Sequence, residues 1–115
     1  MDDLTSKKCV PCESWVPPMA PEKVMEMLQK VKDWETEENL KIKKKFEFKD
    51  FKEAMEFVNK VANLAEEEEH HPNIFIAYNK VTITLTTHFI KGLHENDFIL
   101  AAKINNLTSH KEPIS

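Results

Sequence analysis

The stretch HHPNIFIAYNKVTITLTTH, residues 70–88, decides the fold. It holds two runs rich in β-branched and aromatic residues, 74–78 and 81–87, on either side of Asn79-Lys80, a pair that suits a two-residue turn. In the second run, apolar residues alternate with threonines, which is the pattern of a strand with one buried face. The stretch therefore predicts an antiparallel β-hairpin packed on a core.

Three of the five histidines stand at the open end of this hairpin. His70 and His71 precede Pro72, which biases the residue before it toward extended backbone. His88 follows the second strand, and continued alternation places it on the polar face. Because antiparallel neighbours bring their far ends together, we expect the three imidazoles to lie close to one another. Histidine has an ordinary pKa of roughly 6.5, so such a cluster is suited to proton transfer near neutral pH.

These histidines fit two other roles besides acid–base catalysis, a zinc site and surface hydrogen bonding. A zinc site is disfavoured, because adjacent side chains in an extended chain point to opposite sides and helical zinc pairs prefer the i, i+4 spacing. We therefore expect no metal. Surface histidines that cap loops and hydrogen-bond to the backbone fit the residues as well as catalysis does.

Helical patterns surround the hairpin. A short helix is expected over 21–32, with Pro21 at its first position, and a final helix over 94–106. The strongest pattern predicts a helix after Asp50, with Glu53 as its capping partner. The expected apolar face of that helix comprises Phe51, Ala54, Met55, Val58, Val61, Ala62 and Ala65.

Other residues of the long helix lie outside this face. Phe57 and Leu64 are candidates for a second apolar face that another subunit would cover, and the acidic run Glu66–Glu69 is expected to be a solvated helix end. Upstream, residues 34–48 alternate as two strands joined by a turn, with Lys44 interrupting the apolar face of the second strand.

The resulting order of elements is α-β-β-α-β-β-α. It predicts an α+β fold with a four-stranded antiparallel sheet and three helices packed on one face. We expect an extended arm over residues 1–20, a single domain over 21–108 and a tail over 109–115. Because the sheet edges and one sheet face stay open, a homodimer or homotetramer is expected.

Composition narrows the function classes. Of the 115 residues, 41% are hydrophobic and 31% charged, as in an ordinary soluble domain. The single glycine, Gly92, excludes glycine-rich nucleotide-binding loops, and the net charge of −4 disfavours direct nucleic-acid binding. The chain lacks both an apolar run of roughly 20 residues and the apolar core of a signal peptide. We therefore expect a cytoplasmic or nuclear protein with no membrane segment.

Cys9 and Cys12 form a C-x-x-C pair on the expected arm. A zinc site would need further ligands nearby, and a thioredoxin-like redox pair would lie in a βαβ context. We expect two reduced thiols instead.

The histidine stretch and its flanks resemble the pterin-4a-carbinolamine dehydratase family. That family's spaced pattern of an acidic residue, His-His-Pro, an aromatic residue, a histidine and an aspartate is met by Glu66, His70, His71, Pro72, Tyr78, His88 and Asp97. The resemblance is strong over residues 46–106 and looser over the N-terminal third. Asn73 and Ile74 stand where many members have an acidic residue and tryptophan, so an aromatic lining is expected to be missing. His94 replaces a common serine or threonine, which predicts a weaker helix cap.

The resemblance implies a dehydratase that removes water from 4a-hydroxytetrahydropterin and gives quinonoid dihydropterin, without a cofactor. Such an enzyme recycles the tetrahydropterin cofactor of aromatic amino acid hydroxylases. The resemblance also implies that His70 and His88 transfer protons while His71 mainly holds and orients the pterin. A non-enzymatic alternative of the same fold is a dimerisation partner and coactivator of a homeodomain transcription factor, as animal relatives are.

The remaining site candidates each have two interpretations. Asp97 either caps the last helix or takes part in the site, and capping is favoured. Glu66 either accepts a hydrogen bond from a histidine or is solvated. Thr86 and Thr87 either offer hydroxyls to the pterin or face solvent, and Tyr78 is expected to pack in the hairpin.

Overall fold

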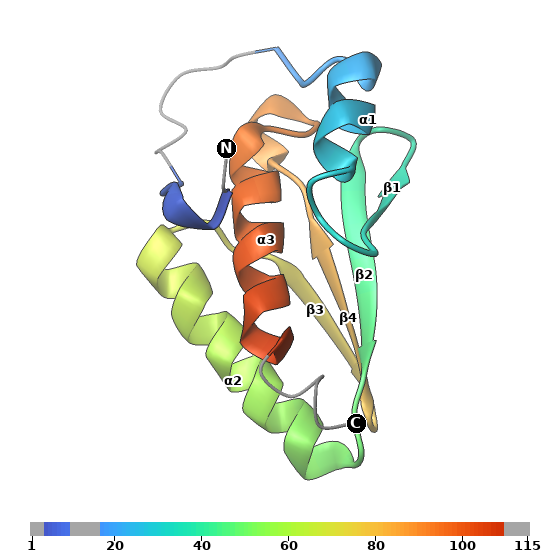
Figure 1. Ribbon diagram of the computed structural model, residues 1–115, viewed down its shortest axis with the longest axis vertical. Coiled ribbons are helices and arrows are strands. Elements are labelled where there is room, and N and C mark those ends of the chain that lie inside the picture. Colours follow the sequence, from blue (N-terminus) through green and yellow to red (C-terminus); the bar gives the residue numbers. More distant parts are fainter. Residues whose placement is uncertain (1–3, 10–16, 110–115) are drawn as a thin grey trace.

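The computed structural model describes residues 4–9 and 17–109, and Figure 1 shows their arrangement. The elements in chain order are η1 (Leu4–Ser6), α1 (Pro21–Leu28), β1 (Glu35–Glu37), β2 (Lys41–Glu47), α2 (Phe51–Glu68), β3 (Asn73–Ala77), β4 (Lys80–Leu85), η2 (His88–Ile90) and α3 (Glu95–Ser109). The predicted α+β class and the order α-β-β-α-β-β-α are confirmed.

The four strands form one antiparallel sheet in the order β1-β2-β4-β3, with the helices on one of its faces (Figure 1). Apolar side chains of the two central strands point toward the helices and are buried; they are Ile42, Phe46, Val81, Ile83 and Leu85. The predicted alternation of the second hairpin strand is therefore confirmed. Strand β3 lies at an edge of this sheet, which leaves its outer side unpaired within the described chain.

The hairpin turn lies one residue earlier than predicted. Ala77 pairs with Lys80, so the turn is Tyr78-Asn79, and Tyr78 takes the left-handed conformation with φ 56°. The cause is a pair of hydrogen bonds between Asn79 and Phe48, the residue that follows β2. The backbone carbonyl of Asn79 accepts from the N–H of Phe48, and its side-chain amide donates to the carbonyl of Phe48, each at 2.8 Å. This contact fixes Asn79 and leaves Tyr78 exposed, so the expected packing of Tyr78 in the hairpin is wrong.

Helix α2 begins as predicted but is rotated from the expected apolar face. The carboxylate of Asp50 accepts from the N–H of Glu53 at 2.9 Å, and Glu53 accepts in turn from the N–H of Lys49. The buried face comprises Ala54, Phe57, Val61, Ala65 and Glu68, while Phe51 and Ala62 are exposed. The proposed second apolar face is therefore wrong for Phe57.

An aromatic cluster explains this rotation. The ring of Phe57 lies 4.7 Å from that of Phe46 and 5.0 Å from that of Phe48, measured between centroids. Burying a large aromatic side chain stabilises the fold more than burying an alanine, so Phe57 turns inward and Ala62 outward. Leu64 is half-buried against the same core.

The acidic run at the end of α2 is not uniformly solvated. Glu68 is buried, and its carboxylate pairs with Lys103 of α3 at 2.7 Å and accepts from the backbone N–H of Cys9 at 2.9 Å. Burial alone would raise the pKa of Glu68, but the contacts with Lys103 and Cys9 hold that pKa below its ordinary value. The expectation of a solvated end is wrong at this one position, because Glu68 faces the arm and α3.

The described residues of the N-terminal arm pack on the domain at several points, of which Cys9 and Met19 are two. Cys9 is buried, with its thiol 3.6 Å from the carbonyl of Asn96. Burial and the nearby charge of Glu68 raise the pKa of the Cys9 thiol to about 12, so the thiol is neutral at physiological pH. Farther along the arm, Met19 donates its N–H to Leu93 at 2.9 Å. Cys12, the other member of the pair, lies outside the described residues.

The one glycine of the chain is needed where the arm crosses it. A Cβ atom on Gly92 would lie 2.5 Å from the Cβ of Pro18, closer than two non-bonded carbon atoms approach. Glycine thus lets the arm lie against the loop that precedes α3.

The described part of the chain shows neither a metal-binding cluster nor a membrane-spanning helix. In residues 4–9 and 17–109, no three His, Cys, Asp or Glu side chains are placed to hold a metal ion. In the same residues, every helix is too short or too polar to cross a bilayer.

Candidate active site

The three histidines of the hairpin line one cavity of about 280 Å³. It lies between the end of α2 and the segment that follows β4, and its lining residues are Glu69, His70, His71, Thr86, Thr87, His88, Phe89 and Asn96. Five of the predicted site residues are therefore in the lining. The other two, Glu66 and Asp97, are not, but each contacts one of the histidines.

The end of α2 directs the adjacent histidines into this region. Glu69 takes the left-handed conformation with φ 56°, and the N–H of His70 bonds back to the carbonyl of Ala65 at 3.2 Å. A non-glycine residue in this conformation costs roughly 1–2 kcal/mol, so the contacts around it must offset strain. The turn ends the helix and lets Pro72 lead the chain into β3.

His70 is held by a buried carboxylate. Its side chain is 11% exposed, and its Nε2 lies 2.6 Å from Oδ1 of Asp97, which is fully buried. The other oxygen of Asp97 accepts from the hydroxyl of Thr87 at 2.9 Å and from the N–H of His94 at 3.0 Å. With Nε2–H donated to the carboxylate, Nδ1 is the ring nitrogen of His70 that remains for a substrate. Asp97 thus caps α3 and orients His70 at once.

His71 has a carboxylate partner of a different kind. Its Nε2 lies 2.6 Å from Oε2 of Glu66, in the last turn of α2. Here the side chains are 60% and 77% exposed, so water competes with the pair. Glu66 was expected either to hydrogen-bond to a histidine or to be solvated. In the structure it hydrogen-bonds to His71.

His88 enters the cavity lining from the other side. Strand β4 ends at Leu85, and His88 is the first residue of η2. The predicted alternation, which continued to His88, therefore stops before it. The residue is exposed, and no other described residue hydrogen-bonds to its ring. Both ring nitrogens of His88 are therefore open to a ligand.

The threonine hydroxyls are already engaged within the chain. Thr86 donates to the carbonyl of Leu40 at 2.7 Å, and Thr87 to Asp97. Their role as hydroxyl groups for the pterin stays a prediction, since this structure shows only their bonds within the chain. Their role in this structure is to tie η2 and β4 to neighbouring elements.

The side chain of His94 caps α3, and the expectation of a weaker cap stays a prediction. The Nδ1 atom of His94 accepts from the N–H of Asn96 at 2.9 Å, and Asp97 accepts from the N–H of His94. A histidine thus supplies the acceptor that serine or threonine usually gives at a helix start.

Phe89 is a lining residue that the sequence pattern did not indicate. It follows His88 directly and brings an aromatic ring to the cavity, where the replacement of the usual acidic-Trp pair by Asn73 and Ile74 predicted none. The sequence did hold one feature that could have indicated Phe89. It is a large apolar residue directly after a candidate catalytic histidine, beyond the last alternating position of the strand.

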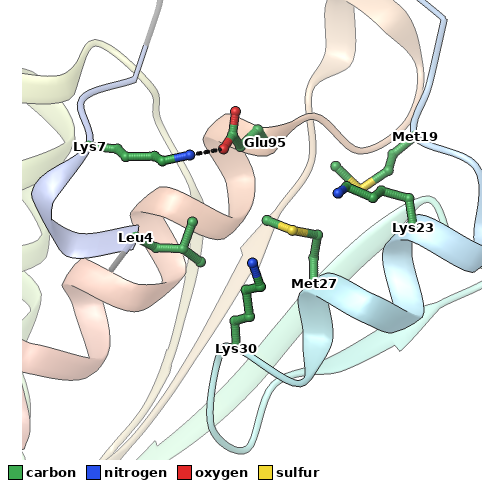
Figure 2. Close-up of a pocket in the computed structure, with 7 residues that line it drawn as sticks. All are labelled: Leu4, Lys7, Met19, Lys23, Met27, Lys30 and Glu95. Carbon is green, nitrogen blue, oxygen red and sulfur yellow. Dashed lines mark hydrogen bonds and ion pairs between the residues drawn. The ribbon is translucent and has the colours of Figure 1, made fainter. Parts of the chain in front are cut away.

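A second cavity, of about 200 Å³, lies between η1, α1 and the start of α3 (Figure 2). Its lining residues are Leu4, Lys7, Met19, Lys23, Met27, Lys30 and Glu95. Figure 2 shows the ion pair of Lys7 with Glu95 at its rim, at 2.8 Å. These residues include no histidine, the type that ordinarily changes protonation near neutral pH. The histidine cavity is therefore the candidate active site.

Comparison with known proteins shows the family to which the chain belongs. Residues 17–107 match the model of the family described as pterin 4 alpha carbinolamine dehydratase. The chain belongs to the pterin-4a-carbinolamine dehydratase family. Provisionally named pterin-4-alpha-carbinolamine dehydratases from Rubrobacter xylanophilus and Halorhodospira halophila are 41% and 45% identical to it. The alignments cover 93% and 90% of this chain, and 100% and 96% of those proteins.

Two solved structures share the fold. A transcriptional coactivator/pterin dehydratase from Brucella melitensis has a TM-score of 0.74 and 35% identity, covering 78% of this chain and 97% of that one. A pterin dehydratase-like protein identified as a RuBisCO assembly factor in the alpha-carboxysome has a TM-score of 0.55 and 26% identity, covering 66% of this chain and 87% of that one. Relatives of this fold are thus named for both catalytic and assembly roles.

Proposed function

We propose that this protein is a 4a-hydroxytetrahydropterin dehydratase that uses its histidines as acid and base. The single observation that carries the proposal is the cavity lined by His70, His71 and His88, in a chain of the pterin-4a-carbinolamine dehydratase family. The product would be quinonoid dihydropterin, and the physiological role would be to recycle the tetrahydropterin cofactor of aromatic amino acid hydroxylases.

The proposed reaction requires only groups that donate and accept protons. The C4a–O bond of the substrate breaks, a proton leaves the adjacent ring nitrogen, and a C=N double bond forms between those two ring atoms. The departing hydroxyl takes up a proton and leaves as water, so no electron donor or acceptor is consumed. Groups that exchange protons near neutral pH therefore suffice, and they typically accelerate such steps by roughly 10²- to 10⁴-fold.

The surroundings of the histidines support a division of roles. His70 has one nitrogen bonded to buried Asp97, which fixes the ring and directs the other nitrogen to the substrate. His88 is exposed in the lining on the opposite segment. We assign these two to proton transfer, one as acid and one as base. His71, held by the exposed Glu66, is assigned to binding and orienting the pterin.

The test is the rate of 4a-hydroxytetrahydropterin dehydration by the wild type and by His70→Ala and His88→Ala. Each variant is expected to lower kcat by roughly 10²- to 10⁴-fold, the usual worth of a general acid or base. His94→Asn is the matched control, because it removes an imidazole outside the cavity lining and keeps a capping acceptor. Unchanged rates in both cavity variants would favour a non-enzymatic binding module.

A separate observation supports binding to another protein chain. Phe75 and Tyr78 are exposed on the edge hairpin, and exposed apolar surface beside an unpaired strand favours association. We infer a homodimer or homotetramer, with a protein partner such as a transcription factor as the alternative occupant of this surface. Light scattering of the purified protein distinguishes an assembly of this chain from a monomer that awaits another partner.

A further inference from the structure

Phe89 is an exposed aromatic side chain placed among proton-transfer groups. It is 52% exposed and lines the cavity next to His88. Among the described lining residues it is the one side chain made only of hydrocarbon; the others are histidines, threonines, a glutamate and an asparagine. An apolar ring left exposed to water beside three imidazoles is suited to a ligand with a flat, π-bonded face.

The turn that carries Phe89 is fastened on both sides. Ile90 is buried, and its N–H bonds to the carbonyl of Thr87 at 3.2 Å. The backbones of Thr87 and Gly92 bridge each other, and Lys91 closes the turn in the left-handed conformation with φ 57°. The turn thus anchors Thr87 and Ile90 inward and leaves Phe89 outward. A ring on such a turn loses little conformational freedom when it binds a ligand.

The polar and apolar parts of the lining complement a pterin. A pterin is a planar fused heterocycle with hydrogen-bonding groups along its edges and π-faces above and below. The histidines can contact edges and exchange protons, but Thr86 and Thr87 have committed their hydroxyls elsewhere. Phe89 has no hydrogen-bonding group in its side chain, so it is suited to contact a face of the ring.

We propose that Phe89 is a substrate-binding residue whose ring stacks on the face of the pterin and sets its position against the histidines. This inference rests on the proposed function, since it takes the occupant of the cavity to be a pterin. Stacking of this kind is made with substrate and transition state alike, so it lowers KM and changes kcat little.

The test measures binding and turnover separately. The dissociation constant of 7,8-dihydropterin is measured by calorimetry for the wild type and for Phe89→Ala, Phe89→Leu and Phe89→Tyr. Phe89→Ala is expected to raise Kd by roughly 5- to 100-fold, the range found when aromatic residues that stack on nucleobases are replaced by alanine. Phe89→Tyr should stay within about threefold of wild type, and Phe89→Leu should fall between them, because only an aromatic ring restores stacking.

Phe51→Ala is the matched control. Phe51 is 49% exposed at the start of α2 and is not among the cavity residues, so its loss should leave Kd and KM unchanged. In the dehydration assay, Phe89→Ala should raise KM by a factor similar to the change in Kd, with kcat within about threefold. A wild-type protein that binds and dehydrates pterins while Phe89→Ala keeps the same Kd would overturn the stacking role alone. A wild-type protein that binds no dihydropterin would overturn the proposed function as well.

Discussion

The two adjacent histidines have the same kind of partner at the same distance, in opposite surroundings. His70 meets Asp97, and His71 meets Glu66, each with 2.6 Å between ring nitrogen and carboxylate oxygen. The first pair is almost entirely buried, whereas the second is mostly exposed. Distance alone would rank the two pairs as equal.

Burial makes the difference between them. In the interior, water does not replace a lost partner, so a missing acceptor leaves a polar group unsatisfied and costs free energy. Exposed ion pairs are screened and contribute little. We therefore expect Asp97 to fix the ring and tautomer of His70, and Glu66 to influence His71 only weakly. Four substitutions test that contrast, in order of decreasing effect.

Asp97→Asn should have the largest effect. The amide keeps an acceptor for the N–H of His94 but loses the charge that faces His70. We expect kcat to fall by roughly 10²-fold or more, and the free energy of unfolding to fall by about 1–3 kcal/mol, since a buried hydrogen-bond network loses a matched partner. Steady-state kinetics and urea unfolding measure the two quantities. A kcat within threefold of wild type would contradict the orienting role of Asp97.

Glu68→Gln sharpens the comparison within a single acidic run, because Glu68 is buried while Glu66 is exposed. It should lower the free energy of unfolding by about 2 kcal/mol at pH 7, since Lys103 loses its partner. The pKa of Glu68 is lower in the folded state than its ordinary 4.5, so its contribution is present above that value and is lost as the pH falls below it. The difference in stability between wild type and variant should therefore shrink between pH 5 and pH 3. A difference that stays constant over that range would count against the ionised pair.

His71→Ala separates binding from chemistry. Because His71 is assigned to holding the pterin, KM should rise by roughly 10-fold while kcat stays within a few-fold, the result expected for lost uniform binding. Stability should change by less than about 0.5 kcal/mol, as for other exposed positions. Initial-rate measurements like those for His70→Ala give both kcat and KM. A loss of kcat equal to that of His70→Ala would contradict the proposal that His70 transfers protons while His71 mainly binds the pterin.

Glu66→Gln should have the smallest effect. The pair with His71 is open to water, so we expect a change in unfolding free energy within about 0.5 kcal/mol and a KM within about threefold of wild type. Measurement at low and at high salt provides the check, since screening should reduce even this small effect. A loss comparable to that of Asp97→Asn would mean that burial does not distinguish the two pairs.

The sequence predicted most of the fold because its main elements carry periodic patterns that burial reinforces. The alternation of Val81, Ile83 and Leu85 and the capping pair Asp50 and Glu53 are local signals, and both predictions agree with the structure. The rotation of α2 was not predicted, because helical spacing does not reveal that Phe57 meets two aromatic rings from β2 and the residue after it. The turn was displaced for a similar reason, since Asn79 bonds to Phe48 across 31 positions.

The candidate site was predictable as a cluster but not in its internal contacts. The hairpin geometry brought His88 to the histidine pair, as expected from strand pairing. That Asp97 both caps α3 and bonds to His70 depends on the packing of α3 against the end of α2, for which no local pattern exists. Phe89 was missed because its importance comes from the cavity it lines.

The most direct test of the central claim is a crystal structure of the protein with bound 7,8-dihydropterin. We expect the heterocycle in the histidine cavity, with ring atoms within hydrogen-bonding distance of Nδ1 of His70 and of a ring nitrogen of His88. A pterin bound elsewhere, for example in the lysine-lined cavity of Figure 2, with the three imidazoles contacting only water, would contradict the assignment of this cavity as the active site.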